Sequence, residues 1–498
     1  MRVLTKNTSV ANLILIITTT VFSFSSMLTA FFMLGSQSLV WFLISALGYF
    51  IPYALIVAQY TKKYAHRPGS IYDWLKDSLS PKAAFVTVFL WYCSYFIWMI
   101  SLFMKVMIPL SILLCGKDTT AQFHWFELPA QFWLSFFAIV LTVVMTTIIT
   151  RGIHTIFSFL KLGGYTMVGL VLLTLISNVL LIIQDTDLSV ANLRSSIAVT
   201  SFFSGTGNSL LSQLPFFIFS ITAFGGLDTI ASLADKTKKG KKRFPKAVII
   251  SSCLILLLYF SGILLWSSAH DIEQLRQAKQ LHLGNLMYGL MAFLGESLGR
   301  SFGLSASTTE LLIQIFVRYT AFTMLVAYLS LLSSISYGPL KSLIQGTPQI
   351  FRSRWAHLND HQMPAKALWI QAAALSLFIG GLALNNHFLA DLFNQLTYMT
   401  NVSRAIPYFI VAASFPFFIK KKIIQKESLL IPDYTLNYFF SFSVCLCISV
   451  AILFQMYEPL KIGNYQNFFT LLIGPLSFGL LASLIYKRIE EKSSLPDV

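Results

Sequence analysis

The sequence predicts an all-α polytopic membrane protein with twelve transmembrane helices, because of its composition, its apolar segments and the placement of its basic residues. Hydrophobic residues make up 56% of the 498 residues and charged residues only 11%, about half of the charged fraction of a typical soluble domain. The apolar segments are continuous, whereas strands of a membrane β-barrel alternate between apolar and polar residues. The composition therefore indicates an integral membrane protein built from helices.

Twelve apolar segments are long enough to cross a bilayer as helices. We expect them at about 10–34, 39–59, 83–114, 131–150, 159–183, 213–234, 246–269, 311–338, 366–384, 388–418, 435–456 and 466–487.

The basic residues predict how these spans are oriented. With the N-terminus inside, 27 of the 36 Lys and Arg residues fall in inner segments and six in outer loops. We therefore expect a multi-pass protein of the cytoplasmic membrane with both termini cytoplasmic. The net charge of +16 is then a topology signal and not a sign of nucleic-acid binding.

The first and sixth expected spans carry similar interruptions. Phe24-Ser25-Ser26-Met27-Leu28-Thr29 and Phe224-Gly225-Gly226-Leu227-Asp228-Thr229 both read Phe-small-small-apolar-x-Thr. Serines can bend a membrane helix, and paired glycines weaken one. Interrupted helices at matching positions of two halves point to a transporter's substrate site. We expect this site to be lined by Ser23, Ser25, Ser26, Ala223, Phe224, Gly225, Gly226 and Asp228.

The alternative interpretation of the sixth segment is an ordinary membrane helix in which the Gly-Gly pair is a packing site. Asp228 argues against that alternative. A carboxylate at membrane depth is costly unless it faces protein or water, so it could pair with a cation or carry a proton. The structural alternative is an acid that bonds nearby backbone amides. The segment ends at a loop with seven basic residues between Lys236 and Lys246, which indicates the cytoplasmic side.

These motifs carry a resemblance to a known family. Phe224-Gly225-Gly226-Leu227-Asp228, with the later Pro245-Lys246, resembles the sixth helix and following loop of the amino acid–polyamine–organocation (APC) superfamily. Leu396–Val402, Ile406-Pro407-Tyr408, Arg151-Gly152-Ile153 and Gly163-Gly164 are similar to permeases of the YjeM type, in the glutamate:GABA antiporter branch.

The resemblance implies a fold and a function. It implies one transporter domain over residues 1–498, with a LeuT-like 5+5 inverted repeat at about 10–183 and 213–418. Two C-terminal helices, 435–456 and 466–487, are appended. We expect loop 60–82 to lie on the inner surface and a short helix near Leu286–Leu294 to cap the outer mouth.

Other residues are candidates for a gate or vestibule. Tyr95, Trp98 and Lys105 share a broad helical face, and Phe22 precedes the first interruption. The alternatives are plain packing for the aromatic residues and snorkelling for Lys105. Arg318 and Arg404 lie within spans, where structural ion pairing is the alternative; Asp391 and Glu310 are the candidate partners of Lys105 and Arg318.

Lys161 is a candidate coupling residue by resemblance. In some proton-coupled relatives a lysine on the fifth helix occupies the place of a sodium ion. The alternative is an inside-positive anchor, because Lys161 lies only ten residues after Arg151.

The expected function is secondary active transport of amino acids or related amines by alternating access, as an antiporter or as a proton-coupled symporter. A transporter-like nutrient sensor is the alternative from another class. No nucleotide-binding loop, zinc-protease motif or nucleophile elbow is present, which argues against an enzyme and against ATP as the driver. The five cysteines and eight histidines show no ligand spacing, so we expect no metal or cofactor; a homo-oligomer is compatible with the sequence.

Overall fold

The computed structural model describes residues 9–68, 70–120, 128–198, 213–237, 240–277, 285–347, 357–383, 387–421, 423, 425–461 and 463–493. Within these ranges the regular structure is helical, and no β-strand occurs. The all-α prediction is therefore confirmed.

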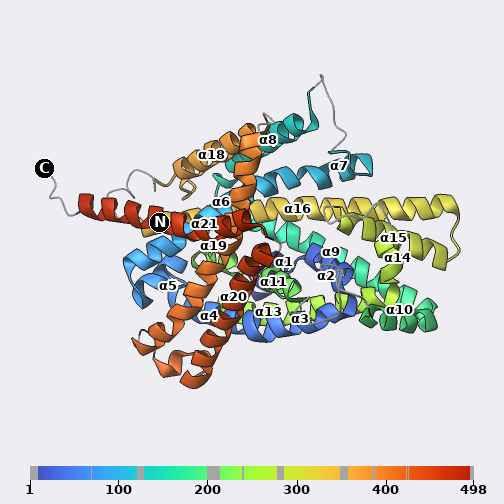
Figure 1. Ribbon diagram of the computed structural model, residues 1–498, viewed down its shortest axis with the longest axis horizontal. Helices are drawn as coiled ribbons and strands as arrows, with labels where there is room; N and C mark the ends of the chain where they lie inside the picture. Colours follow the sequence, from blue (N-terminus) through green and yellow to red (C-terminus); the bar gives the residue numbers. More distant parts are fainter. Residues whose placement is uncertain are drawn as a thin grey trace.

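Figure 1 shows the described helices in chain order, from blue to red. They are α1 (Val10–Val21), α2 (Phe24–Leu34), α3 (Ser38–Ser45), α4 (Ile51–Tyr64), α5 (Ile71–Ser78), α6 (Pro81–Lys105), α7 (Met107–Cys115), α8 (Ala130–Ile149), α9 (Ile153–Gln184), α10 (Thr186–Ala198), α11 (Leu214–Ala223), α12 (Leu227–Ala231), α13 (Gly240–Ala269), α14 (Ile272–Gln277), α15 (Leu286–Ser301), α16 (Ala306–Gly346), α18 (Ala365–Ala383), α19 (His387–Lys420), α20 (Tyr434–Lys461) and α21 (Tyr465–Ser493).

Ten of the described helical segments are long and apolar enough to cross a membrane. Two further apolar segments, Val10–Val21 and Phe216–Ala231, are too short to count as such. These two fall in the first and sixth spans expected from the sequence. The described residues therefore contain ten long apolar segments where the sequence predicts twelve spans, because the first and sixth expected spans are interrupted.

The long helices pack around a common core. α16 contacts α6, α9 and α15; α13 contacts α1 and α4; and α6 also contacts α19. α8 and α18 pack against each other at the upper edge of Figure 1. The last two helices, α20 and α21, pack against α19. Helices from the two ends of the chain therefore share one bundle.

The segments expected as surface elements also form helices. α5 lies within the expected inner loop 60–82 and buries Ile71, Trp74 and Leu75 against the bundle. α15 begins at Leu286, where the sequence predicts a short helix, and it packs against α16 and α9. Both helices therefore pack against the bundle, α5 on α6 and α19 and α15 on α16.

Two glycines let α15 approach α16 closely. A Cβ atom on Gly295 would lie 3.1 Å from the Cα of Ile313, and one on Gly299 would lie 2.5 Å from Thr309 Oγ1. Small residues four positions apart are typical of close helix packing in membranes.

We therefore predict that Gly295→Leu destabilises the protein by about 1–3 kcal/mol, because the backbone of α16 cannot move aside for the new side chain. Gly479 on α21 is the matched control, since a Cβ there meets nothing within 4 Å. Thermal unfolding of both variants in detergent, followed by tryptophan fluorescence, checks this. An unchanged melting temperature for Gly295→Leu would contradict the packing assigned to α15.

Candidate substrate site

Two interrupted helices define the candidate site. Between α1 and α2, Phe22 and Ser23 have extended backbone, with ψ angles of 124° and 107°. Between α11 and α12, Gly226 has φ of +107°, a conformation that side chains with a Cβ rarely adopt. The second interruption falls at the predicted Gly225-Gly226 pair. The first lies at Phe22 and Ser23, just before the predicted Phe24–Thr29 motif, which is helical in α2.

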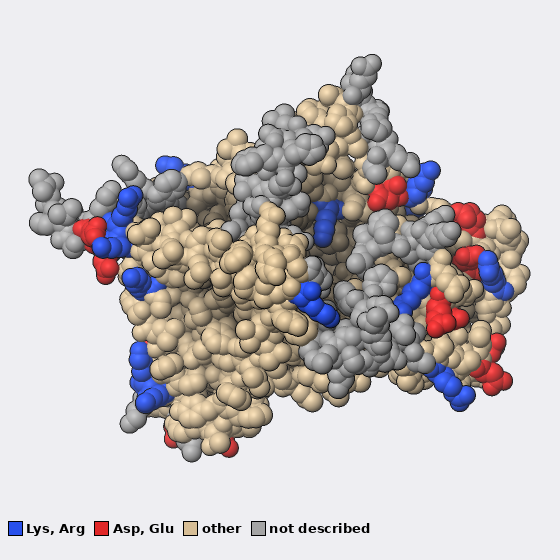
Figure 2. Space-filling view, viewed as in Figure 1, with Lys and Arg blue, Asp and Glu red and all other residues tan. Residues whose placement is uncertain are grey.

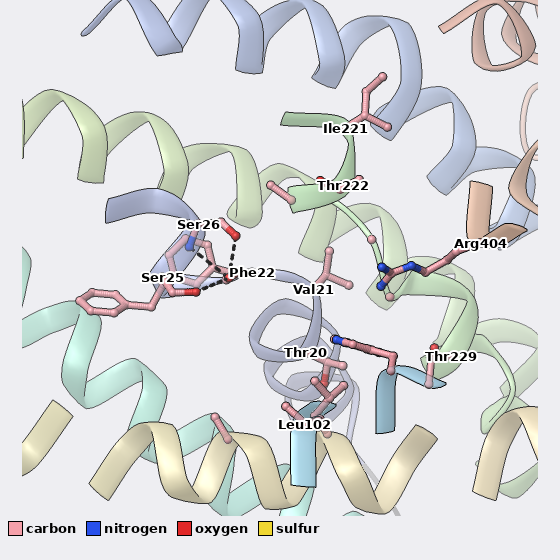
Figure 3. A pocket seen from close by; sticks show the side chains of 18 of the residues that line it. Thr20, Val21, Phe22, Ser25, Ser26, Leu102, Ile221, Thr222, Thr229 and Arg404 are labelled. Carbon is pink, nitrogen blue, oxygen red and sulfur yellow. Dashed lines mark hydrogen bonds between the residues drawn. The ribbon is translucent and has the colours of Figure 1, made fainter. Parts of the chain in front are cut away.

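Ser23 caps the first turn of α2. Its Oγ accepts hydrogen bonds from the Ser26 amide at 3.2 Å and the Ser26 hydroxyl at 2.8 Å, and it lies 3.2 Å from Ser25 Oγ (Figure 3). A serine at this position replaces one of the helical hydrogen bonds that the interruption removes. The first two amides of α2, those of Phe24 and Ser25, belong to the set that no helix can satisfy internally.

Tyr259 on α13 joins the two interruptions. Its hydroxyl accepts a hydrogen bond from the Ser23 amide at 3.1 Å and donates one to the Ala223 carbonyl at 2.9 Å. The side chain is fully buried, and its ring packs on Phe22, Phe42 and Phe224. One phenol therefore satisfies a backbone donor of the first interruption and a backbone acceptor of the second.

A cavity of about 390 Å³ lies at the two interruptions. Its wall comes from α1, α2, α6, α9, α11, α12, α16, α19 and α20. The residues at the two interruptions, between α1 and α2 and between α11 and α12, also line it. Of the residues predicted from the sequence, it brings together Phe22, Ser23, Ser25, Ser26, Tyr95, Trp98, Lys105, Ala223, Gly225 and Gly226. The volume is within the range of small-molecule sites.

Four predicted residues do not line this cavity. Phe224 is buried behind it and stacks on Phe50, with ring centroids 4.5 Å apart. Lys161 is half-buried on α9, one turn before Gly164, which faces α1. The remaining two, Asp228 and Arg318, have hydrogen-bond partners that explain their positions.

Asp228 lies fully buried behind the aromatic wall of the cavity. The Trp91 indole donates to its Oδ2 at 2.5 Å, and the Tyr95 hydroxyl lies 3.4 Å from the same oxygen. Thr229 Oγ1 donates to Tyr95 at 2.9 Å, and the Tyr408 hydroxyl lies 3.4 Å from that of Tyr95. Since Tyr95, Thr229 and Tyr408 line the cavity, they connect it to the carboxylate.

Arg318 is exposed and has a structural role in this arrangement. Its guanidinium donates to the Leu113 carbonyl at 2.9 Å and thereby caps the C-terminal end of α7. It also reaches Gln314, whose amide donates to Glu310, so the predicted partner Glu310 is linked through Gln314. The other suggested acid, Asp391, lies in a segment whose side chains are outside the described residues.

A buried ion pair follows the second interrupted helix. Lys341 on α16 lies 2.5 Å from Asp235 and donates to the Ser232 carbonyl at 3.0 Å. Both side chains are less than a tenth exposed. The pair ties α16 to the chain just after α12. Removing one partner of such a pair leaves an uncompensated buried charge.

Sequence patterns alone missed several of these residues. Tyr259 and Trp91 belong to apolar, aromatic-rich segments in which nothing marks a functional side chain, and Tyr408 is named only within a motif that carries the resemblance. Arg404 is identified from the sequence as a charge within a span, and the structure places it in the cavity wall. Among the described residues, no group of three or more His, Cys, Asp or Glu side chains is arranged to hold a metal ion.

The conformation of Gly226 predicts a strong effect of substitution. We expect Gly226→Val to abolish substrate binding, because a β-branched residue resists φ of +107° and the α11–α12 interruption would rearrange. Gly303 is the matched control, since its φ is +60° and a Cβ there meets nothing within 4 Å. Purified Gly303→Val should bind substrate normally. Wild-type affinity in Gly226→Val would exclude this position from the site.

Comparison with known proteins identifies the family. The amino acid permease family model matches residues 9–478. The inner membrane transporter YjeM of Salmonella typhimurium is 32% identical over 98% of this chain and 97% of its own, and the Escherichia coli K12 protein of that name is 30% identical over 97% and 96%. The aspartate/glutamate permease AcaP of Lactococcus lactis is 22% identical over 68% of this chain and 72% of its own. The chain therefore belongs to the amino acid permease family of the APC superfamily, and it is a membrane transporter of amino acids and not an enzyme.

Proposed function

We propose that this protein is a secondary active transporter that moves its amino acid by alternating access, with the cavity at the two interruptions as the substrate site. The observation that carries the proposal is the meeting of two interrupted apolar helices at one cavity, held together by Tyr259. Discontinuous helices at the membrane midplane form the binding sites of many secondary transporters.

The helix contacts support a 5+5 inverted repeat. When each interrupted helix is counted as one span, α1–α2 and α11–α12 become the first spans of two five-span units. The third span of the first unit, α6, then packs on the fifth span of the second, α19; conversely α16, the third span of the second unit, packs on α9. Exchange of equivalent contacts is what a two-fold repeat requires, and α20 and α21 follow as appended helices.

The backbone at the interruptions suits a zwitterion. The partially positive first turn of α2, with the amides of Phe24 and Ser25, is suited to the substrate carboxylate. The carbonyl groups at the C-terminal ends of α1 and α11 are partially negative and suit the ammonium group. We propose that Ser25 and Ser26 add hydroxyl contacts from the same wall.

We retain both antiport and proton-coupled symport as modes of coupling. Proteoliposomes containing the purified protein separate them: an antiporter takes up labelled amino acid only when amino acid is inside, whereas a symporter accumulates it under a proton gradient. Absence of flux in both formats, with binding intact, would favour the nutrient sensor. We further propose the cytoplasmic membrane as the location, with both termini cytoplasmic.

Asp228 is our first candidate for the coupling group. Asp228→Asn keeps the side-chain shape and an acceptor for Trp91 but removes the charge. If the carboxylate carries a proton that Tyr95 and Tyr408 relay, transport should fall at least tenfold and its pH dependence should flatten. The measurement is the initial uptake rate across pH 5–8 in proteoliposomes. Unchanged transport with an unchanged pH profile would leave Asp228 a structural role only.

Lys161 is the second candidate, and it makes a distinct prediction. A coupling lysine must release its proton, which arginine does not do in the physiological range. Lys161→Arg and Lys161→Ala should then both lose transport. An inside-positive anchor should tolerate arginine fully and alanine largely. Uptake by Lys161→Arg at the wild-type rate and with the wild-type pH profile would exclude the coupling role.

A further inference from the structure

A buried histidine lies at the end of α13, away from the candidate substrate site. His270 directly follows this helix, whereas the basic loop precedes its N-terminal end. With that loop cytoplasmic, as proposed above, His270 is on the outer side of the protein. Its side chain is only 2% exposed, and it lies where α13 and α15 both pack on α9. The proposed transport mechanism does not use this imidazole.

One hydrogen bond determines the protonation state of His270. Its Nε2 lies 3.0 Å from Asn178 Oδ1, and the Asn178 amide nitrogen donates to the Thr174 carbonyl at 2.9 Å. The Asn178 oxygen is therefore an acceptor, so Nε2 of the neutral imidazole carries the proton. Asn178 is itself fully buried. This partner suits a neutral ring and supplies no negative charge for an imidazolium.

Aromatic contacts connect His270 to the first interrupted helix. The imidazole packs on Trp266 with ring centroids 4.7 Å apart and on Phe293 of α15 at 5.4 Å. Trp266 in turn packs on Phe31 of α2 at 5.6 Å. Displacement of His270 therefore disturbs a series of contacts that leads from α15 to the helix beginning at the candidate substrate site.

The charged groups of the segments nearest to His270 have other partners. Glu296 on α15 pairs with Arg300. Asp271, the next residue in the chain, accepts a hydrogen bond from the Glu273 amide, and Arg276 donates to two carbonyls of α2. None of the ion pairs in the described part of the chain includes His270.

The remaining acidic and basic groups of the packed helices are solvated or distant. Figure 2 shows acidic and basic side chains together on the surface at the right-hand end of the molecule, where α10, α14 and α15 lie in Figure 1. Tyr288 on α15 is a neutral phenol. The others are Asp185 and Asp187 at the start of α10, the exposed Arg194, and His154, Lys161 and the basic residues of α13, which lie toward the opposite ends of α9 and α13.

We propose that His270 is an acid-sensitive switch: its protonation releases α15 and the end of α13 from α9 and shifts the transporter toward a conformation that is more open on its outer side. An imidazolium has two N–H donors, whereas Asn178 supplies one acceptor. A buried cation without a counter-charge is costly. The ring therefore takes up a second proton only when this packing opens to water.

The pKa of His270 determines the pH range of the switch. Burial lowers this pKa from 6.5 to about 3. The packed arrangement is therefore fully stable above pH 6.5 and loses stability as the pH falls from 6.5 toward 3. In the open conformation the exposed imidazole has its ordinary pKa. The ratio of open to packed protein should then rise about tenfold between pH 7.5 and pH 5.5.

Hydrogen–deuterium exchange of the purified full-length protein in nanodiscs measures this ratio. The protection of the α15 amides, corrected for the pH dependence of intrinsic exchange, reports the opening equilibrium. We expect this protection to fall about tenfold between pH 7.5 and pH 5.5 in the wild-type protein. His270→Gln keeps a donor for Asn178 but does not titrate, so its protection should change less than twofold. His154→Gln, which alters an exposed histidine on α9, is the matched control and should behave as the wild type.

A second variant tests the sign of the effect. Asn178→Asp places a carboxylate beside the imidazolium, so acid should no longer lower the protection of α15. A wild-type fall in protection in either Asn178→Asp or His270→Gln overturns the switch, and each variant decides if the other does not fold. Protection of wild-type α15 that does not change with pH also overturns it. No substrate is present in these measurements, so the proposed function is tested separately.

Discussion

The structure depends on one constraint, which is that backbone hydrogen-bonding groups inside a membrane must have partners. Two interruptions release such groups near one another, between α1 and α2 and between α11 and α12. Tyr259 satisfies one group from each, and Ser23 satisfies another. What remains is a small set of amides and carbonyls at opposite helix ends, and this set matches the two charged groups of an amino acid. In the proposed account, side chains satisfy some of the released backbone groups and the substrate contacts others.

Around this centre, the protein separates its charges. The carboxylate of Asp228 is enclosed by Trp91, Tyr95 and their neighbours, while the cations Lys105 and Arg404 face the cavity. The Lys341–Asp235 ion pair connects α16 to the chain just after α12. In the proposed account, Tyr95 and Tyr408 belong to both the substrate wall and the hydrogen-bonded path to Asp228.

The sequence predicts the positions of the helices better than it predicts the contacts between them. Apolar length predicts the membrane helices, and serine and glycine clusters predict where two of them are interrupted, because these are local properties of the chain. Tyr259 lies 236 residues from Ser23, so its bridging role depends on packing that no local pattern encodes. Arg318 shows the converse: a charge within a span suggests a vestibule, yet it caps α7. Asp228 marks the correct helix, but only the structure shows that it is hydrogen-bonded to Trp91 and does not line the cavity.

The most direct test of the central claim is whether substrate protects the cavity wall from a thiol reagent. Thr222 lines the cavity beside the second interruption, and the five natural cysteines can be replaced first so that Thr222→Cys carries the sole thiol. The measurement is the rate of modification by a small thiosulfonate in proteoliposomes, with and without a saturating amino acid that the protein transports. The account predicts that the transported amino acid slows modification at least tenfold and that an untransported one does not. Equal modification rates with and without the transported amino acid would contradict the placement of the substrate at the two interruptions.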